Sequence, residues 1–156
     1  MHVTVGDPAP EIALPDQDGH QWRLSDHRGS PVVVYFYPKA DTPGCTSQAC
    51  DVRDHWGKLT AIGAAVAGIS PDPVEQLSRF ATKHALPHRL LADPQREAID
   101  AYGVWGEKHR DGEVRHGVIR SSVVIDAEGR IAAAVPGISP TQQSAAALEA
   151  LRALAR

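Results

Sequence analysis

Residues 32–50 read VVVYFYPKADTPGCTSQAC, an unbroken apolar run followed at once by a segment that holds two cysteines. The six residues Val32–Tyr37 are all β-branched or aromatic, with no polar alternation, so they predict a central strand buried on both faces. The run stops at Pro38, and after a short loop a helix is expected over residues 45–59. The stretch therefore predicts a strand, a loop and a helix in close succession.

The rest of the chain alternates apolar runs with helical patterns, which is typical of an α/β domain whose central sheet is covered by helices. Near the start, Glu11–Leu14 and Gln21–Leu24 flank a turn and predict a β-hairpin. The remaining expected elements are strands over 64–70 and 88–91, a helix capped by Asp72 and running to about His84, a short helix over 94–102, a hairpin over 120–125 and 130–135, and a closing helix after Ser139 and Pro140.

Composition narrows the possible partners and compartment. The 156 residues include 16 Lys or Arg and 19 Asp or Glu, for a net charge of −3, which argues against a nucleic-acid binder. This length predicts one domain over residues 1–156 that folds without crosslinks or metal. No apolar run reaches the roughly 18 residues of a membrane span, and the N-terminus lacks the features of a signal peptide. We therefore expect a cytoplasmic protein, with no membrane partner, whose thiols are kept reduced.

Cys45 is expected at the junction between the strand and the helix. Free backbone N–H groups and the positive end of the helix dipole favour an anion at such a junction, here a thiolate. A cysteine is also a small apolar residue that favours burial, and that is the competing interpretation. The nearby prolines and the hydroxyl of Thr42, three residues earlier, favour a reactive cysteine.

The spacing Pro38-x-x-x-Thr42-x-x-Cys45 resembles the active-site signature of the peroxiredoxins. The segment Thr42-Pro43-Gly44-Cys45-Thr46, with Cys50 five residues after Cys45, is similar to that of the Q-type, or bacterioferritin comigratory protein, group. The resemblance covers most of the chain. It also rests on the apolar strand 32–37, Arg53-Asp54, Gly68-Ile69-Ser70-x-Asp72, Leu90-Leu91-x-Asp93, Tyr102-Gly103-Val104 and Arg120 before Val123-Val124-Ile125-Asp126.

The resemblance implies a thioredoxin-like fold, with a central mixed β-sheet flanked by helices and an N-terminal β-hairpin. It also implies an antioxidant thiol peroxidase without cofactor or metal, which reduces hydrogen peroxide and small organic hydroperoxides. The thiolate of Cys45 would attack the peroxide and become a sulfenic acid. Thr42 would contact thiolate and peroxide, and Pro38 would shield the sulfur from solvent. Arg120 would favour the thiolate and the charge on the leaving oxygen.

Cys50 is the resolving cysteine that the resemblance implies, forming a disulfide with Cys45 that thioredoxin or a similar dithiol reduces. Residues five apart on an ideal helix have Cα atoms about 8.7 Å apart, beyond the limit of about 7 Å for a disulfide. Oxidation should therefore unwind residues 42–52. The same resemblance favours a monomer or a weak dimer.

Four positions depart from the family pattern. Gln48 stands where many members have glutamate, which puts a charge-assisted bond to an arginine there in question. Ser121 and Ser122 follow Arg120 where the family usually has a threonine and an aromatic residue, so the packing around Arg120 should differ. His88 replaces an aromatic residue and is expected at the surface or at a sheet edge.

Three alternatives remain open at the level of sequence. A general thiol-disulfide oxidoreductase normally carries Cys-x-x-Cys, whereas four residues separate the cysteines here. A redox sensor or holdase could use the same disulfide without turnover. A zinc site at Cys45, Cys50 and His55 lacks a fourth ligand.

Arg53 is expected as a structural ion-pair partner, and Asp41 as a solvated loop charge.

Overall fold

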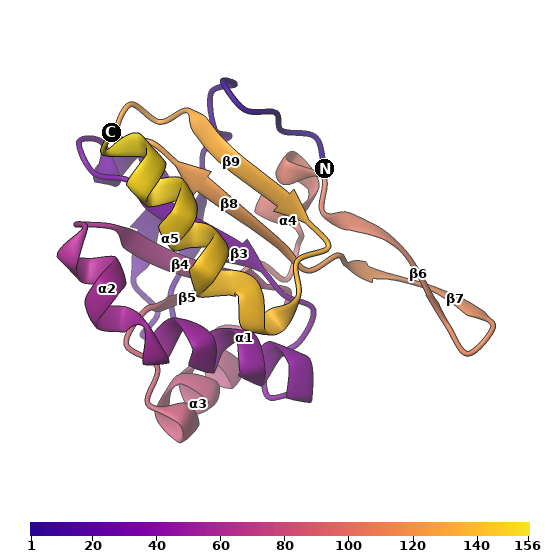
Figure 1. The fold of residues 1–156 in the computed structure, drawn as a ribbon. Helices are drawn as coiled ribbons and strands as arrows, with labels where there is room; N and C mark the ends of the chain where they lie inside the picture. Colours follow the sequence, from indigo (N-terminus) through magenta and orange to yellow (C-terminus); the bar gives the residue numbers. More distant parts are fainter.

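The centre of the structure, a computed structural model that describes residues 1–156, is a five-stranded mixed sheet in the order β5-β4-β3-β8-β9 (Figure 1). The strand β3 (Val32–Phe36) lies in the middle and is buried along its whole length, as its apolar run predicts. It pairs in parallel with β4 (Ala65–Ser70) and antiparallel with β8 (Ser121–Ile125). The outer strands are β5 (Arg89–Ala92) and β9 (Ile131–Pro136).

Successive side chains of β3 point to opposite faces of the sheet, so each face contributes to a separate apolar layer. Val33 and Tyr35 face the layer that contains residues of four helices, while Val32, Val34 and Phe36 face the other. The four helices are α1 (Pro43–Asp54), α2 (Trp56–Ala61), α3 (Val74–His84) and α5 (Gln143–Leu154).

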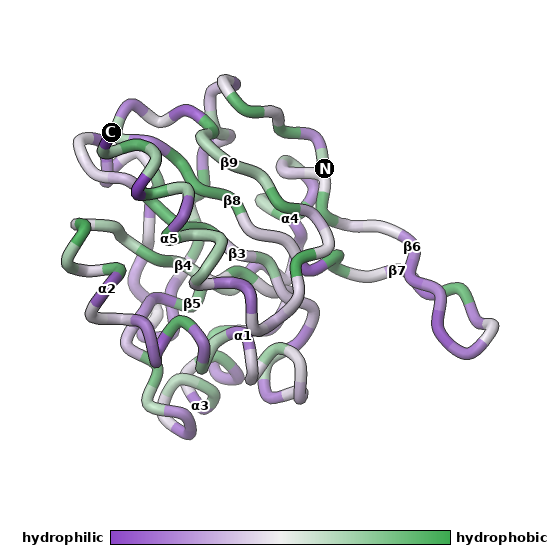
Figure 2. Tube along the Cα trace, in the orientation of Figure 1, coloured by the Kyte–Doolittle hydropathy of each residue, from purple (hydrophilic) through white to green (hydrophobic).

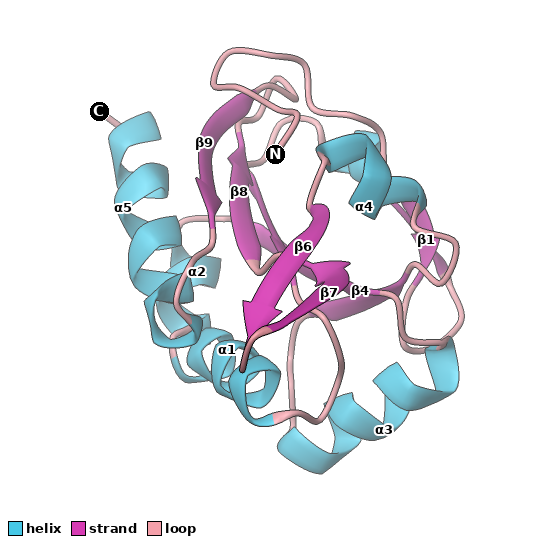
Figure 3. Ribbon diagram, turned by 90° about the vertical axis from the view of Figure 1, so that its right-hand side faces the viewer, coloured by secondary structure: helices cyan, strands magenta, loops and turns pink.

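The opposite face is covered by α4 (Glu97–Tyr102) and by the N-terminal hairpin, which consists of β1 (Ala13–Pro15) and β2 (Gln21–Arg23). Figure 3 shows α5 and α4 on opposite sides of the sheet. The hairpin was predicted from its turn, as was the antiparallel pairing of β8 with β9. The expected α/β architecture, with a mixed sheet between helices, is confirmed.

The helix expected over residues 45–59 is two helices in the structure. Pro43, whose fixed φ suits the first helical position, starts α1 two residues earlier than expected. His55 ends α1 with φ −109° and ψ 13°, and its ring Nδ1 lies 2.7 Å from the carbonyl oxygen of Asp51. The side chain thus competes with the backbone at this carbonyl, and α2 starts as a separate short helix at Trp56.

Asp72 does not cap α3, contrary to the sequence prediction. The residue before the helix is Pro73, and no side chain bonds to the first turn. The carboxylate of Asp72 instead accepts hydrogen bonds from the backbone N–H of Ala40 and the hydroxyl of Ser70, each at 2.7 Å. Asp72 therefore fixes the loop that leads from β3 into α1.

A third hairpin was not predicted from the sequence. The strands β6 (Trp105–Arg110) and β7 (Glu113–Val118) pair antiparallel and project from the body of the molecule (Figure 1). Their mostly exposed and polar residues give no apolar alternation, as the colours of this arm in Figure 2 show. The turn Asp111-Gly112, with φ of 53° and 78°, was the available signal. No helix of the structure is long and apolar enough to cross a membrane.

Candidate active site

Cys45 lies in the first turn of α1, just beyond the end of β3. Its side chain is 1% exposed and belongs to the apolar layer formed by the helices. Both Cys45 and Cys50 are free thiols. The first-turn N–H groups of a helix have no partner within the helix, and they carry the positive end of its dipole. The local fold therefore places the sulfur where a negative charge is favoured.

Arg120 immediately precedes β8, the strand next to β3 in the sheet, and its side chain extends to Cys45. Its Nη1 and Nη2 atoms both donate to the Cys45 sulfur at 3.5 Å. Gly44 makes this approach possible, because a Cβ atom at that position would lie only 2.9 Å from Arg120 Nη2. The guanidinium charge beside the sulfur favours an ionised thiol.

Gln48 does bond to Arg120, although as a neutral amide. Arg120 Nη1 donates to Gln48 Oε1 at 2.7 Å. Gln48 Nε2 donates to Gln143 Oε1 at 3.0 Å, and Gln143 Nε2 donates to the Ser122 hydroxyl at 2.8 Å. Two of the departures noted in the sequence, Gln48 and Ser122, thus belong to one chain of hydrogen bonds. The sequence analysis missed Gln143, because nothing local marks a buried glutamine at a helix start.

Thr42 immediately precedes α1, and its hydroxyl donates to the carbonyl oxygen of Lys39 at 2.7 Å. Its proton is thereby engaged, so the oxygen is left as an acceptor toward an incoming molecule. Pro38 is half-buried and follows Tyr37, whose ring lies in the same apolar layer as Cys45. These two residues lie in the loop before the cysteine, as their spacing predicts.

Asp41 is exposed, as the expected solvated loop charge, and it also pairs with two side chains of α3. Its carboxylate lies 2.8 Å from Lys83 Nζ and 3.1 Å from His84 Nε2, both at the end of α3. The hydrogen bonds from Lys83 and then His84 lower the pKa of Asp41. Together with the bond from Ala40 to Asp72, these contacts hold the loop at two points.

Cys50 lies on the same helix as Cys45 and is half-buried against the same apolar layer. In an intact helix their Cα atoms would be about 8.7 Å apart, which is too far for a disulfide. Arg53, one turn further, donates to the His84 carbonyl oxygen at 2.8 Å and pairs with Asp54 at 3.0 Å. It therefore has the structural role that was expected.

His88 is buried, contrary to the expected surface or edge position. It is 1% exposed, and its Nε2 lies 2.6 Å from the hydroxyl oxygen of Tyr35. Burial, with a further effect of Arg89, lowers the pKa of His88 to about 3, so the ring is neutral at physiological pH. It fills the space of an aromatic side chain and at the same time bonds to a buried phenol.

Lys108, on the inward side of β6, was also missed. Burial and the nearby positive charge of Arg120 lower the pKa of Lys108, whereas Cys45 raises it. Lys108, in the middle of β6, thus adds a second cation near the site.

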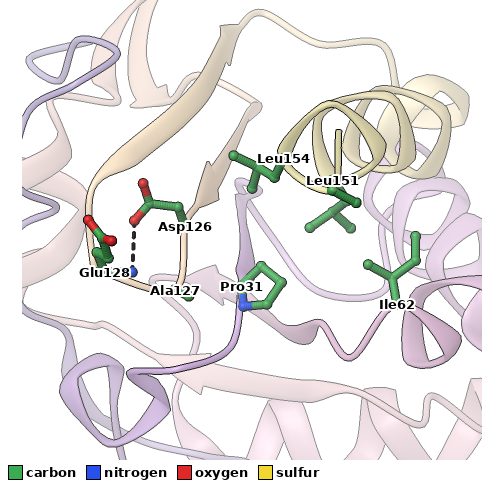
Figure 4. A pocket seen from close by; sticks show the side chains of 8 residues that line it. Pro31, Ile62, Asp126, Ala127, Glu128, Leu151 and Leu154 are labelled. Atoms are coloured by element: carbon green, nitrogen blue, oxygen red, sulfur yellow. Dashed lines mark hydrogen bonds between the residues drawn. The ribbon is translucent and has the colours of Figure 1, made fainter.

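The two cysteines do not form a metal site, and the structure has a cavity away from them. The structure contains no group of three or more His, Cys, Asp or Glu side chains that could hold a metal ion, so Cys45, Cys50 and His55 do not form one. A cavity of about 380 Å³ opens beside Pro31 and Ile62, against Leu151 and Leu154 of α5 (Figure 4). Pro31 precedes β3 and Cys45 follows it, so this cavity lies at the opposite end of the strand from the cysteine.

The site consists of a buried cysteine at a helix start and an arginine that donates to its sulfur, at one end of a mixed sheet. This arrangement is typical of a class of cysteine-dependent oxidoreductases. Comparison with known proteins narrows this class. The model of the AhpC/TSA family matches residues 5–134. Peroxiredoxin Bcp of Escherichia coli is 52% identical over 129 residues, which cover 83% of each chain. The chain belongs to the AhpC/TSA family of peroxiredoxins, and its curated relatives include Bcp peroxiredoxins.

Solved structures agree with this assignment and confirm the expected thioredoxin-like fold. Peroxidoxin BcpB of Mycobacterium tuberculosis is 35% identical with a TM-score of 0.87, over 98% of this chain and 99% of that one. The bacterioferritin comigratory protein of Xanthomonas campestris, which was described for its alkyl peroxide reduction activity, is 29% identical. Its TM-score is 0.90, over 98% of this chain and all of that one.

Proposed function

We propose that this chain reduces hydrogen peroxide and small organic hydroperoxides, with Cys45 as the nucleophile. One observation carries the proposal: both terminal nitrogens of Arg120 donate to the buried sulfur of Cys45 at 3.5 Å. Membership of a peroxidase family supports it, as does the alkyl peroxide reduction described for the Xanthomonas relative.

In the first step the Cys45 thiolate attacks the terminal oxygen of the hydroperoxide. A sulfur–oxygen bond forms, the O–O bond breaks, and the leaving oxygen takes a proton to become water or an alcohol. Cys45 is oxidised to the sulfenic acid and the peroxide is reduced. The N–H groups of Arg120 lie where they can stabilise charge on the leaving oxygen. Thr42 can accept the peroxide O–H, and Pro38 limits access of water to the sulfur.

In the second step the Cys50 thiolate attacks the sulfenic sulfur of Cys45; the S–S bond forms, the S–O bond breaks, and the leaving hydroxide takes a proton from solvent to become water. The intact α1 keeps the two sulfurs apart, so residues 42–52 must unwind first. An external dithiol such as thioredoxin then reduces the disulfide by exchange. The cycle belongs to antioxidant defence in the reducing cytoplasm, carried out by a monomer or a weak dimer.

Two variants test the proposal in a peroxide-consumption assay coupled to thioredoxin and its reductase. Cys45→Ser should abolish turnover. Cys50→Ser should still consume about one equivalent of peroxide per chain but should not recycle through a disulfide. Full turnover by Cys45→Ser would overturn the assignment.

The same assay separates the alternatives. Insulin reduction faster than peroxide consumption would indicate a general disulfide reductase. Peroxide consumed only once per wild-type chain, even with the full reducing system, would indicate a redox sensor or holdase.

A further inference from the structure

The hydrogen-bond chain from Arg120 ends at α5, an element that contributes no atom to the reaction. We propose that Gln143, the first residue of α5, is a positioning residue for the peroxidase reaction. It fixes the side-chain amide of Gln48 with its oxygen toward Arg120, and so holds the guanidinium against the Cys45 sulfur. The inference rests on the proposed function and names a further residue on which that site depends.

The direction of each hydrogen bond supports this role. A guanidinium has only donors, so Gln48 must present its oxygen to Arg120 and not its NH₂ group. The two ends of an amide have nearly the same shape, so packing alone does not choose between the two rotations. Gln143 supports the same rotation from the other end of the amide, because its Oε1 accepts from Gln48 Nε2 at 3.0 Å.

The burial of both glutamines strengthens the preference for this rotation of the Gln48 amide. Gln48 and Gln143 are both 0% exposed, and Ser122, which accepts from Gln143 Nε2, is 3% exposed. Water is therefore excluded as a substitute partner. Without the Gln143 side chain, the Gln48 NH₂ group would lose its only hydrogen-bond partner in the dry interior, so an unpaired buried donor would oppose the bond from Arg120 to the Gln48 oxygen.

The position of the Arg120 guanidinium affects the electrostatic environment of the Cys45 sulfur. Arg120 forms no ion pair with a carboxylate, so its charge remains available to Cys45. The other titratable groups whose pKa values respond to Cys45 are Lys108 of β6 and the buried phenols of Tyr35 and Tyr37, on β3 and directly after it. None of these replaces the two donors of Arg120, so a displaced guanidinium should disfavour the thiolate.

A double-mutant cycle tests the proposal on the reduced full-length protein. Gln143→Leu should lower the rate constant for oxidation of Cys45 by hydrogen peroxide, measured by rapid mixing without reductant, by about tenfold. It should also move the pH profile of Cys45 alkylation by iodoacetamide, recorded in a Cys50→Ser background, to higher pH. In a Gln48→Glu background both effects should largely disappear, because a carboxylate presents an oxygen to Arg120 in either rotation.

The neighbouring residue provides the matched control. Ser144 also ties α5 to α1, through Asp51, but has no bond to the Arg120 chain. Ser144→Ala should leave both the rate constant for Cys45 oxidation and the pH profile of Cys45 alkylation unchanged. If Gln143→Leu does not fold, as judged by circular dichroism, Gln143→Met has the length of glutamine without its polar atoms and serves instead.

An equal loss in the wild-type and Gln48→Glu backgrounds, or a loss of rate without a shift in the pH profiles, would show a merely structural role. The failure of the proposed function would look different. In that case the wild-type protein itself would not react with peroxide, while the alkylation profiles would still decide the role of Gln143.

Discussion

Arg120 makes three contacts with a single guanidinium group: two to the Cys45 sulfur and one to Gln48. The planar fork of an arginine can point two donors at one atom while its charge stays fixed. At the scale of residues, the site therefore depends on the geometry of Arg120 as much as on its charge.

Arg120→Lys separates charge from geometry. The ammonium keeps the positive charge but cannot reproduce two fixed donors and the bond to Gln48, so the rate of Cys45 oxidation should fall about 100-fold. Stopped-flow measurement of the reduced protein with hydrogen peroxide gives this rate. A lysine variant as fast as wild type would show that charge alone is sufficient.

Gly44→Ala tests the close approach of the guanidinium. The new Cβ atom would lie 2.9 Å from Arg120 Nη2, so the arginine must shift, and peroxide reactivity should fall about tenfold. Gly57→Ala in α2 is the matched control, because a Cβ atom there has nothing within 4 Å. It should leave activity unchanged and raise helix stability by up to about 1 kcal/mol. Equal activity of both variants would contradict the close approach.

At the scale of elements, α1 connects both cysteines to the rest of the molecule. Gln48 and Asp51, about one turn apart on α1, bond to the adjacent residues Gln143 and Ser144 of α5. Formation of the proposed disulfide must break the helix between Cys45 and Cys50, and with it these bonds. The beginning of α5 should therefore respond to oxidation together with α1.

Amide hydrogen exchange can follow this unwinding. Exchange in residues 42–52 should be faster in the disulfide form than in the reduced form, because helical hydrogen bonds are lost. Residues of β3 provide an internal control and should keep their protection. Identical protection of residues 42–52 in both forms would count against redox-coupled unwinding.

Three differences between the predicted and observed secondary structure have identifiable physical reasons. The helix over residues 45–59 is interrupted at His55, where φ is −109° and ψ is 13° and the ring bonds to the Asp51 carbonyl, and a periodic pattern does not show this. Asp72 has the residue type of a cap, but its carboxylate has partners on two other segments. The β6–β7 hairpin has no buried face, so hydrophobic patterning carries no signal for it.

At the scale of the whole molecule, the apolar layer around α1 contains a buried polar pair, Tyr35 and His88. Gly68 allows it, because a Cβ atom there would lie 2.5 Å from the Tyr35 ring. The lowered pKa of His88, about 3, is below the ordinary value of 6.5, so the unfolded chain binds a proton that the folded one does not. Stability from this group is complete above pH 6.5 and is lost as the pH falls towards 3.

A double variant, His88→Phe with Tyr35→Phe, should remove this dependence. Between pH 6.5 and 4 the free energy of unfolding of the wild type should fall by about 1 kcal/mol per pH unit more than that of the variant. Urea unfolding at several pH values measures both, and the carboxylates common to the two proteins cancel in the difference. Parallel curves would show that His88 protonates without unfolding.

The sequence by itself determined the features that depend on neighbours along the chain. The apolar run 32–37 specified the central strand, and the loop with two prolines before the cysteine placed the helix start to within two residues. The spacing of Pro38, Thr42 and Cys45, with Arg120 in its ordered context, carried the resemblance to the peroxiredoxins, which the comparisons confirm at the level of family.

Only the tertiary structure decided which side chains meet. Cys45 and Arg120 are 75 residues apart in the chain, and Gln48 and Gln143 are 95 apart. The position of each depends on the order of strands in the sheet and on the packing of α5 against α1. His88 likewise became a core residue because Tyr35, 53 residues away, offers it a hydroxyl. Burial and hydrogen-bond partners between distant segments are properties of the whole fold, which local patterns do not contain.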